Sequence, residues 1–472
     1  MKKYLALCLA LLLCLIPLTA LAETAPPSGD PTPTPAPTPK PVQQSELLAG
    51  LEEPACKAAV LMDAETGTVL YDFHGDDQNY PASITKVMTA LLTLEAVERG
   101  ELSLEQVVTV EEGFDTDLSP DGTSQNLKVG EEISVEQLLY CALVASANDA
   151  CNVLAMATAG DVPSFISRMN HRVEELGLIG TQFVNAHGLH DDDHYTTAHD
   201  IAALTRVALE NETFAAIVSS KSHTVPATNL SKERRFTSTN ALIAPIYEGR
   251  YTYSRAIGVK TGSTSKAGKC LVSAAKQDER VLICVVLGAE DVTDEKGVMT
   301  RKVFSESKRL LEWGLETFAT RTLLSASTPI REVEVTLSTD VTAVAVKPQT
   351  ALEAILPKDL VPEEFQWDVK LYAESVEAPV TVGQALGEIT VRNGDHVYGT
   401  VPLVAVAGAE RSELLSNVKA TRDFFSLPLV KVGLVALGLV LLFLILRFGV
   451  LGGRSKSGYR GRSRSNYRGR KR

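Results

Sequence analysis

Cysteine is scarce in this sequence, and the spacing of the few thiols excludes two common uses. The chain of 472 residues holds seven cysteines, of which Cys8 and Cys14 lie in an apolar run at the N-terminus. The other five are an odd number without a C-x-x-C pair, so the spacing predicts neither a disulfide framework nor a zinc site. We expect most of them to be small, buried, apolar groups. They are Cys56, Cys141, Cys151, Cys270 and Cys284.

Between its two ends, the chain has far fewer positively charged residues than negatively charged ones. The formal net charge is −12. Residues 1–22 carry two lysines, and residues 447–472 carry ten Lys or Arg and no acid, so the remainder has a charge of about −24. Such an acidic surface argues against binding of nucleic acid or another polyanion. The sequence also lacks internal repeats and any nucleotide or cofactor motif, so we expect no cofactor.

The N-terminus has the composition of an export segment. Residues 1–22 combine a basic start, an apolar run and a small-x-small end, which together predict a cleaved signal peptide. Residues 23–46 follow as a tether, with eight prolines between Glu23 and Ser45 that favour an extended, semi-rigid chain. The folded part of the protein is therefore expected to begin near residue 47.

The C-terminus has the composition of a membrane anchor. Residues 427–450 are apolar and long enough to span a bilayer once, and Lys431 is close enough to one edge to reach the interface. The basic tail at residues 451–472 is expected in the cytoplasm by the positive-inside rule. A topology signal that contacts anionic lipid explains this tail more simply than nucleic-acid binding does. We therefore expect a single-pass protein of the cell membrane, with its folded part outside.

The pattern between these ends predicts an α+β domain at residues 47–320 and a small all-β domain at residues 328–410. The first should contain a hairpin in residues 56–73, a helix from Ser83 to Gly100, a hairpin in residues 270–287 and a closing helix. Between the first helix and the second hairpin we expect a helix with Ser134 as N-cap, in a capping box with Gln137, and helices at residues 163–176 and 198–210. The second shows short β-branched runs broken by glycine and Asn-Gly turns, as in β-rich domains. Residues 411–426 are a polar connector, expected to be helical.

The helix that begins near Ser83 carries a lysine three residues later. Residues at i and i+3 are neighbours on a helix, so the Lys86 amine can reach the Ser83 hydroxyl. This is the geometry of a nucleophile and its base. The S-x-x-K spacing alone is a weak signal, because it recurs at Ser263/Lys266, Ser305/Lys308 and Ser416/Lys419.

Two more short motifs follow in chain order. Ser146-Ala147-Asn148 falls in a turn between two expected helices, and Lys260-Thr261-Gly262 lies at the end of an expected strand. Each motif is common by chance. S-x-x-K at a helix start, S-x-N between helices and K-T-G on a strand, in this order, are the motif set of the penicillin-recognising serine enzymes. The combination makes Ser83 the predicted nucleophile.

The residues around these motifs narrow the resemblance. The stretches "FVNAHGLHDDDHYTTAHD", "STNALI" and "GVKTGSTSKAGKCLVSAA" resemble the D-alanyl-D-alanine carboxypeptidases, the low-molecular-mass penicillin-binding proteins. The resemblance covers residues 47–318 and extends to the following β-domain. It implies a β-lactamase/transpeptidase-like catalytic domain, with helices on an antiparallel sheet. It also implies removal of the terminal D-alanine from peptidoglycan stem peptides through an acyl-enzyme, with β-lactams as inhibitors.

The resemblance implies a role for each motif residue. Ser83 attacks, Lys86 takes its proton, Ser146 relays a proton to the leaving D-alanine, and Asn148 holds the substrate amide. The backbone N–H groups of Ser83 and Ser263 form the oxyanion hole. Arg301 is a candidate second anchor for the terminal carboxylate, although it could equally be a solvated arginine at a helix end. The substrate-binding set is completed by Lys260, Thr261, Gly262 and Ser263.

Class A β-lactamases share the three motifs but add a glutamate that activates water. Glu174 and Glu175 are the candidates near the motifs for that role. Their position at a helix end before Gly177 predicts solvated surface residues instead. We therefore expect slow release of a penicilloyl adduct, and hence inhibition by penicillin rather than resistance to it.

A histidine-rich stretch resembles a metal site. It contains His187, His190, His194 and His199, with three aspartates at residues 191–193. A run of loop residues places ligands around a single metal only by chance. We therefore expect no metal, and a polar loop whose hydrogen bonds fix one wall of the active site.

Two other functions remain open on the sequence. The same residues could serve a D,D-endopeptidase or transpeptidase, because these differ only in which acceptor reaches the acyl-enzyme. A membrane sensor that is acylated by β-lactams and signals inward is the other alternative. Such a sensor needs a cytoplasmic effector, for which the basic tail is too small.

Overall fold

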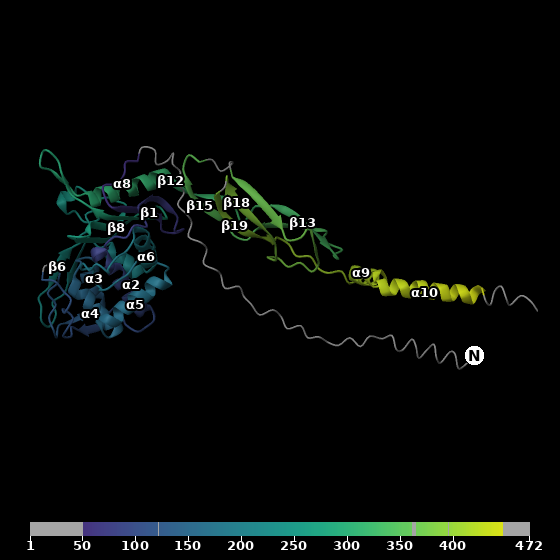
Figure 1. The fold of residues 1–472 in the computed structure, drawn as a ribbon, viewed down its shortest axis with the longest axis horizontal. Coiled ribbons are helices and arrows are strands. Elements are labelled where there is room, and N and C mark those ends of the chain that lie inside the picture. Colours follow the sequence, from purple (N-terminus) through teal and green to yellow (C-terminus); the bar gives the residue numbers. More distant parts are fainter. Residues whose placement is uncertain (1–50, 121, 361–364, 395, 447–472) are drawn as a thin grey trace, which may run out of the picture.

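The computed structural model describes residues 51–120, 122–360, 365–394 and 396–446. The expected signal peptide, the tether and the basic tail lie outside these residues. Figure 1 shows a helix-rich unit at one end, a β-rich unit beside it and α10 (Pro428–Ile445) at the other end. This order along the long axis follows the order of the sequence.

A five-stranded antiparallel sheet forms the centre of the helix-rich unit. Its strand order is β2 (Val69–Phe73), β1 (Ala58–Asp63), β9 (Arg280–Ala289), β8 (Gly268–Gln277) and β7 (Ala256–Thr264). Both predicted hairpins are confirmed, since β1 pairs with β2 and β8 pairs with β9. Successive side chains of a strand face opposite sides, so Val60 packs in the core on one face and Leu61 in the core on the other.

Helices cover both faces of this sheet. The larger core lies beneath α2 (Lys86–Glu98), α3 (Val135–Leu143), α4 (Asn148–Ala159), α5 (Val162–Glu175), α6 (Ala198–Glu210) and α7 (Glu212–Val218). The smaller core lies on the other face beneath α8 (Lys302–Thr317). The predicted N-cap is confirmed at α3, where the Ser134 side chain accepts from the backbone N–H of Gln137, while the Gln137 side chain contacts Glu136 and His223 instead of completing the capping box. Helix α6 has the predicted bounds, whereas α7 was not predicted.

Three two-stranded sheets and two 3-10 turns complete this unit. The sheets are β3 (Val107–Thr109) with β4 (Glu132–Ser134), β5 (Ser222–Val225) with β6 (Arg234–Thr237), and β10 (Val292–Thr293) with β11 (Met299–Thr300). The turns are η1 (Ala82–Thr85) and η2 (Tyr247–Gly249). Both 3-10 turns contribute residues to the pocket described below.

The β-rich unit begins at Phe318, because β12 (Phe318–Leu324) pairs with β15 (Leu352–Pro357). Its strands therefore start before residue 328. The remaining strands form one sheet in the order β16 (Gln366–Leu371), β18 (Ala385–Asn393), β19 (His396–Ala405), β14 (Ala343–Pro348), β13 (Arg331–Thr336) and β17 (Ser375–Glu377). It has a core of its own, separate from the two cores of the helix-rich unit.

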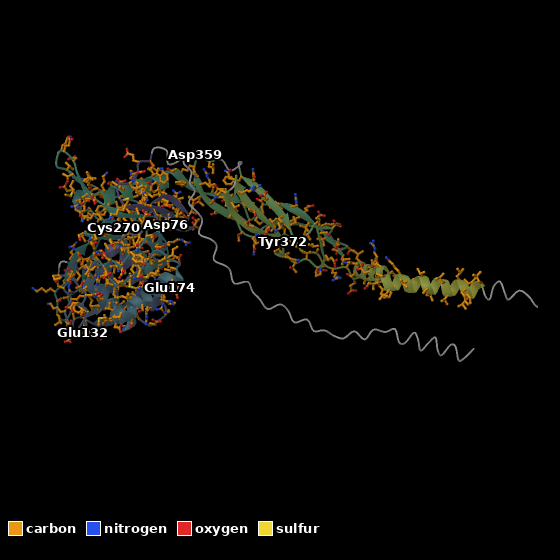
Figure 2. All side chains as sticks on the ribbon, in the orientation of Figure 1. Asp76, Glu132, Glu174, Cys270, Asp359 and Tyr372 are labelled. Atoms are coloured by element: carbon orange, nitrogen blue, oxygen red, sulfur yellow. The ribbon has the colours of Figure 1, made fainter. Side chains whose placement is uncertain are left out.

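Two consecutive helices follow the β-rich unit. Helix α9 (Glu413–Ser426) begins at the N-cap Ser412, which confirms the helical connector. Helix α10 has 18 residues, which corresponds to about 27 Å at 1.5 Å per residue and approaches the thickness of a bilayer core. Its side chains project without neighbours around them (Figure 2), and none is buried. One C-terminal apolar helix therefore fits a membrane anchor.

Candidate active site

Ser83 lies in the 3-10 turn that leads into α2. We predicted that the α-helix would begin at Ser83, which is wrong, because η1 spans Ala82–Thr85 and α2 begins at Lys86. The turn is tightly packed: a side chain at Gly188 would lie 1.9 Å from the Ala82 carbonyl oxygen. The i, i+3 geometry is nevertheless confirmed, with Lys86 Nζ 2.9 Å from Ser83 Oγ.

The Lys86 amine is completely buried and has three protein partners. Besides Ser83 Oγ, they are Asn148 Oδ1 at 2.7 Å and the His187 carbonyl oxygen at 2.6 Å. Burial lowers the pKa of this amine to about 8, because a charged group loses its solvation. The amide and carbonyl oxygens can only accept hydrogen bonds, so a neutral amine gives them its two N–H groups. Its lone pair then faces the Ser83 hydroxyl, which is the arrangement of a general base.

The turn between α3 and α4 presents Ser146 to the same space. Its backbone is in the left-handed region, with φ of 64°, which is uncommon for a residue other than glycine and often marks a functional position. The Ser146 hydroxyl accepts a hydrogen bond from Lys260 Nζ at 2.9 Å. Asn148 is the first residue of α4. It meets the Lys86 amine rather than lining the pocket.

Strand β7 carries the K-T-G motif in its middle, not at its end as predicted. Lys260 is 1% exposed and donates to Ser146 Oγ and to the Thr261 carbonyl oxygen. Burial first, and then the nearby charge of Lys86, hold the pKa of the Lys260 amine well below its usual value. Gly262 packs directly on the nucleophile turn: a Cβ there would lie 2.9 Å from the Pro81 carbonyl oxygen and 3.1 Å from Ser83 N. The glycine thus brings β7 against the backbone of Ser83.

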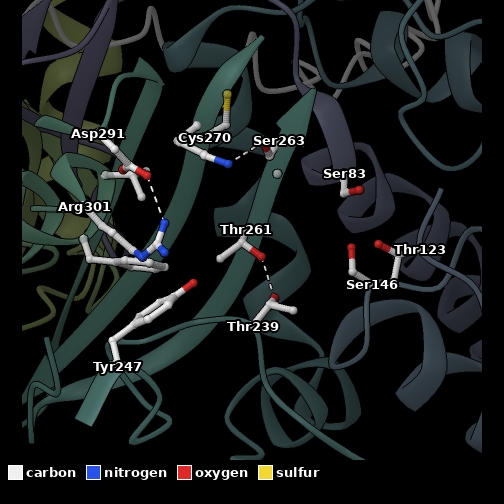
Figure 3. Close-up of a pocket in the computed structure, with 14 residues that line it drawn as sticks. Ser83, Thr123, Ser146, Thr239, Tyr247, Thr261, Ser263, Cys270, Asp291 and Arg301 are labelled. Carbon is white, nitrogen blue, oxygen red and sulfur yellow. Dashed lines mark hydrogen bonds and ion pairs between the residues drawn. The ribbon is translucent and has the colours of Figure 1, made fainter. Parts of the chain in front are cut away.

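One pocket joins these motifs. Figure 3 shows the hydroxyls of Ser83, Ser146 and Thr123 at one end of it and Arg301, Asp291 and Tyr247 at the other. Thr261 and Ser263 lie between the two ends on β7. The remaining lining residues are Thr239, Gly262, Lys269, Cys270, Val303 and Phe304. The pocket is an elongated groove with a nucleophile at one end and hydroxyls along its floor.

The chain matches the family model described as D-alanyl-D-alanine carboxypeptidase over residues 44–291. This match covers more than half of the chain. The chain belongs to this family.

Named relatives agree with this assignment. The D-alanyl-D-alanine carboxypeptidase DacC of Escherichia coli is 31% identical over 77% of this chain and 86% of that protein. DacF of Bacillus subtilis is 27% identical over 77% of this chain and 88% of that protein. The crystal structure of penicillin-binding protein 5 from Haemophilus influenzae has a TM-score of 0.61 and 28% identity, and the match covers 76% of this chain and 99% of that one. Residues 318–411 match the model of the penicillin-binding protein 5 C-terminal domain.

In this carboxypeptidase, the histidine-rich stretch forms hydrogen bonds to the nucleophile turn. His194 Nδ1 accepts from the Val184 N–H, so its Nε2–H donates to Thr85 Oγ1, and Thr85 in turn donates to the Ala82 carbonyl oxygen. Burial lowers the pKa of His194 to about 3, which keeps the ring neutral. His187 contacts Asp117 Oδ2 through Nε2 and accepts from the Leu189 N–H through Nδ1.

These contacts support the prediction that the stretch fixes a wall of the site. Both ring nitrogens of His187 and of His194 have protein partners, so neither ring presents a free nitrogen to a ligand. His199 instead pairs with Asp72 and Asp76. The absence of a metal stays a prediction.

The two glutamates considered for water activation are exposed residues of α5. Glu175 pairs with Arg172 at 2.9 Å. Neither glutamate lines the pocket, and Asp291 is the one acidic residue among the described residues that do.

The structure adds residues that our sequence reasoning missed. The His187 carbonyl has no side-chain signature, so no sequence motif could have indicated it. Thr239 could have been found, because it lies in the "STNALI" stretch that carried the resemblance, and its hydroxyl contacts that of Thr261 at 2.5 Å. Lys269 and Asp291 line the pocket without belonging to any of the three motifs.

Proposed function

We propose that this chain hydrolyses the peptide bond between the two terminal D-alanines of a peptidoglycan stem peptide, with Ser83 as the nucleophile. The observation that carries this proposal is the Lys86 amine, fully buried and 2.9 Å from Ser83 Oγ. A neutral amine in this position takes the Ser83 proton as the oxygen attacks the carbonyl carbon. The family membership supports the substrate.

The negative charge on the carbonyl oxygen is then stabilised by two backbone N–H groups, those of Ser83 and Ser263. The tight packing of Gly262 on the Ser83 turn supports this assignment, because it brings the two backbones together. Loss of one such donor typically costs about 3 kcal/mol of transition-state stabilisation.

The leaving group departs when the C–N bond breaks and its nitrogen is protonated. We assign this relay to Ser146, whose hydroxyl faces the same end of the groove as Ser83 (Figure 3) and accepts from Lys260. Water then attacks the Ser83 ester, and the second product leaves with a new carboxylate. Asn148 holds the Lys86 amine through Oδ1, and the contact of this residue with the substrate amide remains part of the proposal.

The terminal carboxylate is proposed to lie over β7, against the hydroxyls of Thr261 and Ser263. Gly262 contributes its backbone to this carboxylate site. The buried Lys260 contributes positive electrostatic potential to it. Arg301 lines the far end of the same pocket, although its guanidinium already pairs with Asp291 at 2.9 Å. A β-lactam, which carries a comparable carboxylate, should acylate Ser83 and leave slowly.

The placement of the enzyme follows from its ends. We propose export by residues 1–22, a tether at residues 23–46, a catalytic domain from residue 47 to the end of α8 at Thr317, and a β-domain from Phe318 to about residue 410. The connector and α10 would anchor the chain as a single-pass membrane protein, with its catalytic domain outside and residues 451–472 in the cytoplasm. The β-domain would then hold the active site away from the bilayer, toward the cell wall.

Intact-mass measurement of the full-length protein after brief exposure to penicillin tests the proposal, with D-alanine release from a D-Ala-D-Ala peptide measured in parallel. Ser83→Ala should abolish both the adduct and the release. Ser305→Ala is the matched control, because Ser305 also precedes a lysine by three residues but lies on α8, outside the pocket. An adduct without release of D-alanine would favour the transpeptidase or sensor alternatives, and no adduct would refute the assignment of Ser83.

A further inference from the structure

Four cationic side chains surround the candidate active site, and they differ in what they can offer a ligand. Lys86 and Lys260 are 0% and 1% exposed. Their amines are committed to internal acceptors, namely Ser83, Asn148 and His187 for the first and Ser146 and Thr261 for the second. Neither lysine lines the pocket. They can act on the reacting atoms or through Ser146, but they do not present an ammonium group to a carboxylate in the groove.

Arg301 does line the pocket, but its charge is already engaged. Its guanidinium donates to Asp291 Oδ2 at 2.9 Å and stacks over the Tyr247 ring, 4.2 Å from the ring centroid. Its backbone N–H donates to the Tyr251 hydroxyl. Figure 3 shows the Asp291–Arg301 pair at the end of the groove away from Ser83. The neighbouring carboxylate largely cancels the attraction of Arg301 for a second anion.

Lys269 is different in both respects. It lines the pocket and is only half-buried. It stands opposite Ser263 in the β7–β8 ladder, and residues directly opposite on antiparallel strands have neighbouring side chains. Its Nζ donates to Ser263 Oγ at 3.1 Å. Among the described residues, no aspartate or glutamate forms an ion pair with it within 4.0 Å. An ammonium group has three donors, so this single bond leaves two for a ligand.

We infer that Lys269 is the cation that binds the terminal carboxylate of the substrate and makes this site specific for peptides that end in a free acid. The inference rests on the proposed function. A carboxylate placed over β7 would receive the Lys269 ammonium on one side and the hydroxyls of Thr261 and Ser263 on the other. All three residues line the pocket, and Figure 3 shows Thr261 and Ser263 between Ser83 and Arg301. Lys269 would therefore select for the free carboxylate of the terminal D-alanine, the residue that leaves.

The test compares two peptides that differ only in the carboxylate. One ends in D-Ala-D-Ala, and the other is the same peptide with a C-terminal amide. Lys269→Met in the full-length protein should lower kcat/KM for the free acid about tenfold, mainly through KM. It should leave turnover of the amide unchanged. Lys269→Arg should retain most of the preference for the acid. Lys266→Met is the matched control, because Lys266 is an exposed lysine of the same β7–β8 turn that does not line the pocket.

The outcomes separate this inference from the proposed function. If the wild type releases D-alanine and Lys269→Met lowers kcat/KM for the free acid alone, Lys269 binds the carboxylate. Equal losses on both peptides would show a merely structural role, and an unchanged kcat/KM would show that another group binds the carboxylate; either result overturns the inference while the proposed function stands. A wild type that releases neither D-alanine from the free acid nor D-alanine amide from the amidated peptide would refute the proposed function and this inference with it.

Discussion

Gly262→Ala is the substitution that most directly tests how the K-T-G strand serves the nucleophile. A Cβ at this position would lie 2.9 Å from the Pro81 carbonyl oxygen, 3.1 Å from Ala82 Cβ and 3.1 Å from Ser83 N. Two of these three atoms are backbone, and the third is fixed directly to it, so no flexible side chain can swing away. Either β7 or the turn that carries Ser83 has to move.

The size of the movement follows from these distances. Ordinary contacts of a Cβ begin near 3.4 Å, so relief of the contact with the Pro81 oxygen requires a shift of about 0.5 Å. A misplacement of about 1 Å can reduce a reaction rate roughly 10²-fold. We therefore expect kcat/KM for D-alanine release to fall between about 10-fold and 100-fold, or about 1.4 to 2.7 kcal/mol of transition-state stabilisation. Overpacking should also lower the free energy of unfolding by about 1 to 3 kcal/mol.

Gly314→Ala separates these two effects. Gly314 lies on α8, where an added Cβ would meet Leu61 Cδ2 at 2.5 Å and Leu282 Cδ1 at 2.8 Å. These atoms belong to the core on the face of the sheet beneath α8. This control should lower the temperature of unfolding and leave kcat/KM nearly unchanged. The reasoning fails if Gly262→Ala keeps the wild-type kcat/KM, or if Gly314→Ala loses as much activity at the same protein stability.

Two pH profiles supply further predictions. Because burial lowers the pKa of Lys86 to about 8 and the proposed base must be neutral, kcat/KM should rise with pH and level off above about 8; a rate that falls over this range would contradict the role of Lys86. Hydrogen bonding to Asp72 is the main cause that raises the pKa of His199 to about 9, above about 6.5 in the unfolded chain. The stability from this pair should therefore be fully present below about pH 6.5 and disappear as the pH rises through about 9, by roughly 1 to 2 kcal/mol. In thermal unfolding measured across this pH range, His199→Gln should reduce the loss of stability. If the variant loses as much stability as the wild type, the pair of His199 and Asp72 is not the cause.

Elements with strong local signals were predictable from the sequence. The hairpins β1–β2 and β8–β9, the N-cap Ser134 and the bounds of α6 were all predicted, because alternation, turn residues and capping depend on neighbouring residues. The start of α2 was wrong for a non-local reason. Thr85 is held by His194, and Gly188 packs against Ala82. These contacts keep residues 82–85 in a tighter turn than their helix-forming sequence would favour.

The candidate site was predictable as a set of motifs but not as a network. The i, i+3 spacing gave the contact between Ser83 and Lys86, since both residues lie on one local element. The contacts of Lys86 with Asn148 and of Lys260 with Ser146 join residues 62 and 114 positions apart. No spacing rule reaches that far, so these partners could be expected only to lie near each other. Asp291 and Arg301 flank the strand pair β10–β11, in which Val292 lies opposite Thr300, and our sequence reasoning did not predict that pair of strands.

The surroundings of Lys86 explain how a buried lysine can serve as a base in so acidic a chain. Its three partners are a hydroxyl, an amide oxygen and a backbone carbonyl oxygen, and none of them is a carboxylate. A carboxylate partner would raise the pKa of the amine and hold it in the charged form. Asp149 follows Asn148 directly, yet its oxygens accept from Ser124 and from the backbone N–H groups of residues 125, 127 and 150. The Asp149 carboxylate is therefore neutralised in part by these hydrogen bonds, and burial remains the larger influence on the pKa of Lys86. The Lys86 amine can then be neutral when Ser83 gives up its proton.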